Sequence, residues 1–474
     1  MQEPFVVVGG DAAGLSAASK LTREDPDRDV IVFEKGRWIS FAHCGTPYFV
    51  KGEVASLTDL LSLTPEDVGE RGIDLRRDHE VVGIDPDDRT VRVRSADGTT
   101  DQPYGDLLIA SGARAIDDPF PNLRALDGAF TLHHMDSAAA MRAYLTLPES
   151  FSLADLGGGE YVDAALAERY GAMDPPETAA LVGGGYVGVE MAEALSAHDL
   201  TIHLFQRTGT VLPGFGRAVG ERVEEHLEER GVRVHCDAPV DALEGDDRVS
   251  GVRFGDERLA VDMALVGVGV RANTDFLDGA GIDRDERGAV VVDRYGRTSA
   301  EGVFAAGDCA TDFHAVTGER AWVPLGLTAN RAGRAVGTTV AGEATPTGTV
   351  AGTAAVKAFD LEAGLTGVID HDEAREAGFD PVSETITARS RSGYYPGAAP
   401  TTVTLTADRG TGRLLGGAIV GADRAAIRID TVATALEGGL TVAELERSDL
   451  AYAPPFSPVW DPVLVAAKVL EGSR

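Results

Sequence analysis

The sequence predicts an α/β protein that contains two Rossmann-like βαβ units. Two segments share one order of apolar strand, glycine turn, helix of small residues and second strand. They are PFVVVGGDAAGLSAASKL with DVIVFEKG, and TAALVGGGYVGVEMAEAL with LTIHLFQRTG. The chain has 474 residues, enough for about three domains of roughly 150 residues each. A third unit is therefore expected beside the two repeats.

The first glycine turn departs from the dinucleotide-binding motif. Gly9 and Gly14 match the outer glycines, but Asp11 stands where the middle glycine is usual. Glu34 ends the next strand, where a carboxylate can accept hydrogen bonds from a ribose. A solvated strand end is the alternative for Glu34. The residues expected at this cofactor site are Gly9, Gly10, Asp11, Ala12, Ala13, Gly14, Glu34 and Lys35.

The second turn fits the full motif, Gly183-x-Gly185-x-x-Gly188. Its second strand ends in Gln206 and Arg207, with no carboxylate. An arginine attracts a 2′-phosphate, so this unit is expected to prefer NADPH, and NADH is the alternative coenzyme. A solvated loop position is the alternative for Arg207. The residues expected here are Gly183, Gly185, Tyr186, Val187, Gly188, Gln206 and Arg207.

Two further apolar strands end in turns of small residues. Residues 107–115 (LLIASGARA) form one, and residues 303–310 (VFAAGDCA) form the other. The Asp308 carboxylate in the second turn can accept a hydrogen bond from a ribitol hydroxyl, cap the following helix, or do both.

The formal net charge of −33 is the most unusual bulk property. Self-repulsion at this charge destabilises a compact chain, and 1 M salt shortens the screening length to about 3 Å. We therefore expect a protein of a salt-rich, halophilic cytoplasm, although an acidic surface kept for solubility is an alternative. Nucleic acid is disfavoured as a partner because phosphates need a basic face. A membrane is not expected, since no run of 18 apolar residues and no signal peptide occurs.

The segment SFAHCGTPYFVKGEV, residues 40–54, carries Cys44. The other cysteines, Cys236 and Cys309, lie far away in sequence, so no disulfide framework is indicated. A small buried residue and a reactive thiol both remain possible for Cys44 on this ground.

Together and in this order, both glycine turns, the Cys44 segment, ASGA and AAGD resemble the pyridine nucleotide–disulfide oxidoreductases over nearly the whole chain. GVGVRANT and YAPPFSPVWDP narrow the resemblance to the branch with a single redox-active cysteine, which holds coenzyme A-disulfide reductases, persulfide reductases and NADH oxidases. The resemblance implies a glutathione reductase-like fold. An FAD domain (residues 1–135 and 275–343) would surround an NAD(P) domain (136–274), followed by an α+β dimerisation domain (344–474). It also places Val81, Ala110, Ser111, Gly112, Asp308 and Gly269 at the cofactor sites.

The resemblance implies that Cys44 lies against the flavin and receives its electrons. Members with two cysteines carry the second five residues on, where this chain has Phe49, so Cys44 is expected to react alone. The residues around Cys44 suggest that it opens a helix, whose amides would lower the thiol pKa. His43, where the family often has Asn, is expected to contact substrate, to hold the thiolate or to point away. The oxidases carry a His in the first glycine loop, and this chain has none there.

Two further groups of residues follow from the resemblance. Ser16, Lys20, Arg23, Ser40 and His43 match positions that bind coenzyme A, and Arg76 and Arg77 could extend this basic patch. An ordinary amphipathic helix face is the alternative. Tyr394, Tyr395 and Tyr452 resemble tyrosines that reach the partner subunit's cysteine in a homodimer, or they are plain interface aromatics. Trp460 stands where a basic residue can occur, which leaves that part of coenzyme A binding open.

The sequence thus indicates an FAD-dependent NAD(P)H:disulfide reductase, with coenzyme A disulfide as the first substrate. A persulfide or polysulfide reductase, an NADH oxidase and a low-turnover flavoprotein sensor are the alternatives. Residues 151–177 are longer than usual for the family and are expected to form a surface insertion, with a specificity lid as the sharper hypothesis.

Overall fold

A five-stranded parallel sheet forms the core of the first unit in the computed structural model, which describes residues 3–474. Its strands, in spatial order, are β18 (Val303–Ala305), β7 (Asp106–Ile109), β1 (Phe5–Val8), β2 (Val30–Phe33) and β3 (Ile73–Arg76). All four residues of β1 are buried and apolar, as expected for a parallel sheet covered on both faces. Because β18 comes from residues 303–305, this unit is discontinuous in sequence.

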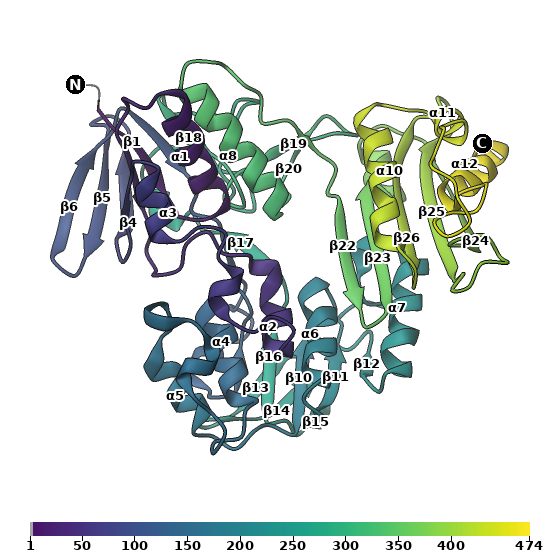
Figure 1. The fold of residues 1–474 in the computed structure, drawn as a ribbon, viewed down its shortest axis with the longest axis horizontal. Coiled ribbons are helices and arrows are strands. Elements are labelled where there is room, and N and C mark those ends of the chain that lie inside the picture. The colour runs from purple at the N-terminus through teal and green to yellow at the C-terminus, as the bar shows by residue number, and fades with distance from the viewer. Residues whose placement is uncertain (1–2) are drawn as a thin grey trace.

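Helices α1 (Ala12–Glu24) and α8 (Gly326–Val340) pack side by side against this sheet (Figure 1). A Cβ at Gly333 would lie 2.1 Å from the Ala13 carbonyl oxygen, so glycine permits the close helix contact. An antiparallel sheet packs on the other face. Its strands are β4 (Glu80–Asp85), β5 (Thr90–Ser95) and β6 (Gly98–Pro103).

The second unit has its own five-stranded parallel sheet. The strands, in spatial order, are β12 (Arg233–His235), β11 (Thr201–Phe205), β10 (Thr178–Val182), β16 (Met263–Val266) and β9 (Ala129–Phe130). The other elements are α4 (Met135–Tyr144), α5 (Ala164–Gly171), α6 (Tyr186–Ser196), α7 (Arg217–Glu229), β13 (Ala242–Gly245), β14 (Val249–Phe254) and β15 (Glu257–Leu259). Strand β9 pairs with β16 although it precedes residue 136. The exact domain boundaries stay predictions.

The third unit is an antiparallel sheet with helices, set apart from the first unit in Figure 1. Its strands, in spatial order, are β22 (Ala354–Ala358), β23 (Leu361–Gly367), β26 (Leu414–Gly421), β25 (Pro400–Asp408) and β24 (Pro381–Arg389). The helices are α9 (His371–Glu376), α10 (Ala425–Glu437), α11 (Val442–Glu446) and α12 (Pro462–Ser473). The predicted fold class, two Rossmann-like units and a C-terminal α+β unit, is confirmed. Within residues 3–474 no helix has the length and apolar character needed to cross a membrane.

Residues 151–177 differ from the expected surface insertion. Four of their side chains are buried in the core that also holds Phe49: Leu156, Val162, Ala167 and Tyr170. The Gly157 carbonyl oxygen accepts a hydrogen bond from Ser56 Oγ at 2.8 Å. The prediction of a surface insertion is therefore wrong for this part, because apolar side chains in and around α5 bury against α4.

Glu193 on α6 joins the three units. Its carboxylate accepts hydrogen bonds from Lys51 of α2 (Thr46–Lys51) at 2.6 Å and from Lys357 of β22 at 2.7 Å. The Phe359 N–H donates a third at 2.7 Å. Burial opposes ionisation of Glu193, but these hydrogen bonds outweigh it and lower the carboxyl pKa. Two of the five lysines of the chain thus meet at one carboxylate.

We expect Glu193→Gln to lower the free energy of unfolding at pH 7 by about 1.5–3 kcal/mol, because hydrogen bonds to a charged group are lost. Since the folded pKa of Glu193 is lowered, its contribution is present above the ordinary value of 4.5 and is lost as the pH falls toward the folded value. Urea unfolding at a series of pH values should show the difference from the parent shrinking below pH 4.5. Glu168→Gln, at an exposed site on α5, is the control, and a difference that did not vary with pH would contradict the prediction.

Candidate active site

The two glycine turns are built alike. A Cβ at Gly14 would lie 1.9 Å from the Gly9 carbonyl oxygen, and a Cβ at Gly188 would lie 1.9 Å from the Gly183 carbonyl oxygen. Real Cβ atoms do not approach an oxygen this closely, so only glycine allows each helix to begin against its strand. The sequence repeat is therefore also a structural repeat.

The residue that ends each second strand holds the turn by its side chain. Glu34 Oε2 accepts a hydrogen bond from the Gly10 N–H at 2.9 Å, and Gln206 Oε1 accepts one from the Gly184 N–H at 3.0 Å. Burial raises the pKa of Glu34, although the backbone N–H groups of Gly10 and Gly36 oppose the rise. The chemical difference between the two units is thus a carboxylate in the first and an amide in the second.

Most of the other predicted cofactor residues follow parallel strands at their carboxyl ends, where open α/β sheets bind ligands. They are Lys35 after β2, Ala110, Ser111 and Gly112 after β7, Asp308 after β18, Arg207 after β11 and Gly269 after β16. Arg207 is exposed, and Tyr186, the first residue of α6, packs its ring against Phe215 at 5.4 Å. Val81 lies instead on β4, buried in the antiparallel sheet.

Asp308 presents a carboxyl group that has no hydrogen-bond donor among residues 3–474. Burial raises its pKa to about 6, with His43 lowering it and Asp11 raising it. These three side chains therefore share one electrostatic environment at the carboxyl end of the first sheet.

Cys44 lies in a 3-10 turn, His43–Gly45, that leads into α2. Gly45 is the N-cap of α2, so the helix begins two residues after the cysteine and not at it. The thiol is accessible to solvent. Even so, desolvation by the surrounding protein raises the pKa of Cys44, and the nearby carboxyl groups of Glu190 and Asp308 raise it further. The expectation that this chain lowers the thiol pKa is wrong, because desolvation and these two carboxyl groups outweigh the lowering effect of a hydrogen bond from the backbone of Cys44.

The other two cysteines, Cys309 and Cys236, are also free thiols. Cys309 is fully buried, and its thiol donates to the Ile109 carbonyl oxygen at 3.3 Å. Cys236 donates to Glu224 at 3.4 Å. Phe49, at the position of the second cysteine of two-cysteine enzymes, is buried.

Glu190 and Tyr48 are candidate site residues that the sequence analysis missed. Tyr48 donates a hydrogen bond from its hydroxyl to Glu190 Oε1 at 3.2 Å, which joins α2 to α6. Burial raises the pKa of Glu190 to about 7, with Tyr48 lowering it and Glu193 raising it. Its position in the sequence is the signal that could have identified Glu190. It lies two residues after Gly188, in the helix that begins at the second glycine turn.

His43 is directed to the first glycine turn. Its Nε2 lies 2.6 Å from Asp11 Oδ2. Ser40, with a φ of 48°, donates its N–H to the Gly10 carbonyl oxygen at 3.0 Å. Both residues expected at the substrate end thus lie against the turn.

The expected coenzyme A face of α1 is less positive than its sequence suggests. Lys20 forms an ion pair with Glu24, and Ser16 Oγ donates to Asn330 on α8 at 2.8 Å. Arg23 is exposed. Arg76 pairs with Asp74, and Arg77 pairs with Glu160 of the 151–177 segment. Acids of this chain therefore offset most of the proposed basic patch.

The predicted tyrosines lie on two loops of the third unit, one between β24 and β25 and the other between α11 and α12, and these elements lie far from α2 in Figure 1. Tyr394 and Tyr395 belong to one loop, and Tyr452 belongs to the other, with Trp460 close to its end. All four rings are exposed, and Lys468 Nζ lies 5.4 Å from the Trp460 ring centroid. The structure does not bring the tyrosines to the Cys44 of the same chain.

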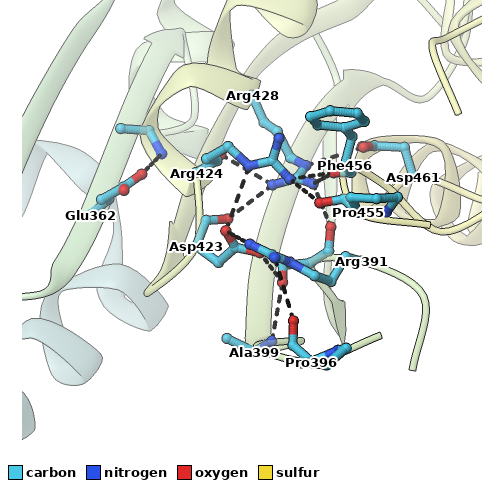
Figure 2. Close-up of polar contacts among 12 residues, drawn as sticks. Glu362, Arg391, Pro396, Ala399, Asp423, Arg424, Arg428, Pro455, Phe456 and Asp461 are labelled. Carbon is cyan, nitrogen blue, oxygen red and sulfur yellow. Dashed lines mark hydrogen bonds and ion pairs between the residues drawn. The ribbon is translucent and has the colours of Figure 1, made fainter. Parts of the chain in front are cut away.

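Ion pairs and hydrogen bonds with residues at the start of α10 hold each of these two loops (Figure 2). Arg391 Nε donates to Asp423 at 2.7 Å, and Arg428 Nε donates to Asp461 at 3.1 Å. Arg428 also donates to the Phe456 carbonyl oxygen at 3.0 Å. The exposed aromatic loops are thus fixed in place by charges behind them.

The family model described as pyridine nucleotide-disulphide oxidoreductase matches residues 3–333. The chain belongs to this family. The model of the dimerisation domain of the pyridine nucleotide-disulphide oxidoreductases matches residues 353–462, which indicates a homodimer. The resemblance found from the motifs is confirmed, and the protein is an oxidoreductase of a family that depends on a flavin and NAD(P)H.

The names of several relatives include sulfur compounds as substrates. The chain is 35% identical to the NAD(P)H coenzyme A polysulfide/persulfide reductase of Pyrococcus horikoshii, over 99% of each chain. It is 29% identical to the coenzyme A disulfide reductase of Staphylococcus aureus, over 96% of each. Its structure resembles the NAD-dependent persulfide reductase from A. fulgidus with a TM-score of 0.90 and 32% identity, covering 99% of this chain and 83% of that one.

The residues present fit two dinucleotides. In the first unit, Glu34 can accept from a ribose, and the Asp308 carboxyl, which has no donor in residues 3–474, can accept from a ribitol chain. In the second unit, no atom lies within 4 Å of a Cβ built at Gly185, so open space precedes α6. These acceptors in the first unit and the open turn in the second fit a dinucleotide in each unit.

We expect Glu190→Gln to speed alkylation of reduced Cys44 by iodoacetamide at pH 8 by about threefold, because removing the carboxylate favours the thiolate. Glu190, with a pKa of about 7, is ionised at pH 8 and opposes the thiolate, whereas at pH 6 it is largely neutral. The difference between variant and parent should therefore disappear at pH 6. Equal rates at pH 8, or a similar gain in the control Glu168→Gln, would refute this prediction.

Proposed function

We propose that the protein is an FAD-dependent NAD(P)H:disulfide reductase that acts on coenzyme A disulfide through Cys44. The observation that carries this proposal is the position of Cys44, whose thiol is influenced by Asp308 of the first unit and by Glu190 of the second. An accessible sulfur between two nucleotide sites is suited to receive electrons and to meet a small substrate.

In the proposed reaction, the Cys44 thiolate attacks one sulfur of the disulfide and breaks the S–S bond. One thiol leaves, and the other is held as a mixed disulfide until two electrons release it. When bound, the flavin supplies the transfer of those electrons from NAD(P)H to sulfur. Glu190 and Tyr48 tie α2, which follows Cys44, to the second unit and keep the two sites in register.

Several finer points belong to this proposal. Ser16, Lys20, Arg23, Ser40 and His43 would bind coenzyme A. The loops with Tyr394, Tyr395 and Tyr452 would complete the active site of the partner subunit, which is supported by their exposure and by the ion pairs behind them. Exposed Arg207 favours NADPH without excluding NADH. The charge of −33 supports a salt-rich cytoplasm as the setting.

A persulfide or polysulfide reductase is the second candidate, favoured by the names of the Pyrococcus horikoshii and A. fulgidus relatives. Dedicated oxidase chemistry is disfavoured by the residues Asp11-Ala12-Ala13, which include no histidine. A low-turnover sensor would bleach its flavin with NADPH without turning over any disulfide.

The test is a steady-state screen at molar salt with NADH and NADPH against coenzyme A disulfide, polysulfide and oxygen. We expect turnover of coenzyme A disulfide to be abolished by Cys44→Ser, because the attacking sulfur is removed, while NAD(P)H still bleaches the flavin. Cys236→Ser is the matched control and should keep the parent rate. Turnover retained in Cys44→Ser would overturn the mechanism.

Charge removal on α1 separates the two sulfur substrates. We expect Lys20→Gln with Arg23→Gln to raise KM for coenzyme A disulfide by about fivefold and to leave polysulfide unchanged, because only coenzyme A carries phosphates. Arg23 should contribute more, since Lys20 is paired with Glu24. Arg92→Gln on β5 is the control. A KM unchanged for both substrates would remove α1 from the coenzyme A site.

A further inference from the structure

Two residues at unusual positions, one in the dinucleotide-binding motif and one in the Cys44 segment, meet in space. Asp11 replaces the usual middle glycine of the first turn, and His43 stands where asparagine is frequent. They are 32 residues apart in sequence, yet His43 Nε2 lies 2.6 Å from Asp11 Oδ2. The two unusual side chains therefore pair with each other. His43 also directly precedes Cys44 in the same 3-10 turn.

Asp11 is not used as a helix cap. It is the N-cap residue of α1, a position at which Asp normally accepts a hydrogen bond from the first helical turn. Its side chain makes no such bond. The carboxylate is turned to the imidazole instead, which fixes the orientation of the ring.

His43 is held on other sides as well. Its ring packs on Phe41 with centroids 4.0 Å apart and lies 5.3 Å from the ring of His133. Burial lowers the pKa of His133, with His43 and Lys35 contributing, so His133 adds little positive charge beside it. Asp308 is the second carboxyl group that interacts with His43. The charged and titratable groups around this ring are thus Asp11, Asp308, His133 and the adjacent Cys44.

His43 also remains able to donate a proton. Its side chain is 42% exposed, and within residues 3–474 its Nδ1 makes no hydrogen bond. A histidine oriented by an aspartate through one nitrogen, with the other nitrogen open beside a nucleophile, is an arrangement suited to general acid–base work.

We propose that His43 is the proton donor to the departing thiolate and that Asp11 is its positioning residue. The inference rests on the proposed function. A bond forms between Cys44 Sγ and one substrate sulfur, the substrate S–S bond breaks, and the leaving thiolate takes the proton of His43 Nδ1. Two electrons from NAD(P)H later cleave the mixed disulfide. His43 recovers a proton from solvent, so one disulfide, one NAD(P)H and one proton give two thiols.

The test compares disulfides that differ in their need for a proton. An alkyl disulfide, coenzyme A disulfide, releases a basic thiolate, whereas an aryl disulfide, 5,5′-dithiobis(2-nitrobenzoate), releases a stable anion. In flavin-loaded enzyme, His43→Asn should lower kcat with the alkyl disulfide by about 100-fold and affect the aryl disulfide little. His134→Asn is the control, because His134 caps α4 through its side chain and Asn can replace it there.

Asp11→Asn gives a readout that a purely structural role would not move. Removing the carboxylate frees the ring from its orientation, so kcat with the alkyl disulfide should fall while kcat with the aryl disulfide stays near the parent value. Equal losses on both disulfides in His43→Asn would overturn the proposal, as would no loss. A change only in flavin content in Asp11→Asn would show that the pair serves the pyrophosphate site and overturn it too. A parent enzyme that turns over neither disulfide would instead overturn the proposed function, and this inference with it.

Discussion

The contact between a glycine Cα and a carbonyl oxygen at each nucleotide turn determines where everything else in the site lies. At Gly14 and Gly188 the helix begins so near its strand that a Cβ would stand 1.9 Å from an oxygen. This proximity fixes the start of α1 and of α6. It thereby places Asp11 next to the Cys44 turn and Glu190 next to α2. Two similar turns thus position Asp11 and Glu190, which contact His43 and Tyr48 on either side of Cys44 in the sequence.

The short-range features of the site could be predicted from sequence. Glycine spacing and apolar strands locate both turns, because steric exclusion acts between residues close in the chain. Phe49, five residues after Cys44, shows that this chain lacks the second cysteine of the two-cysteine members of the family. The fold class follows from the order of these motifs.

Contacts between distant segments could not be predicted in this way. The pairing of Asp11 with His43, and of Tyr48 with Glu190, depends on how α2 packs, which no local pattern encodes. The direction of the pKa shift of Cys44 could not be predicted for the same reason. The sequence shows a helix start, but the desolvation and the carboxyl groups that prevail come from remote segments. Burial within residues 151–177 likewise appears only when α5 meets α4.

The discontinuity of the first sheet has a consequence for synthesis. Strand β18 and helix α8 follow the whole second unit in the chain. Until they emerge from the ribosome, β7 has an open edge and the small-residue face of α1 has no partner for Ala13 and Ala17. The second unit can form its contiguous sheet core earlier, since domains fold as units during synthesis. The first unit is therefore completed late, after the contiguous sheet of the second unit.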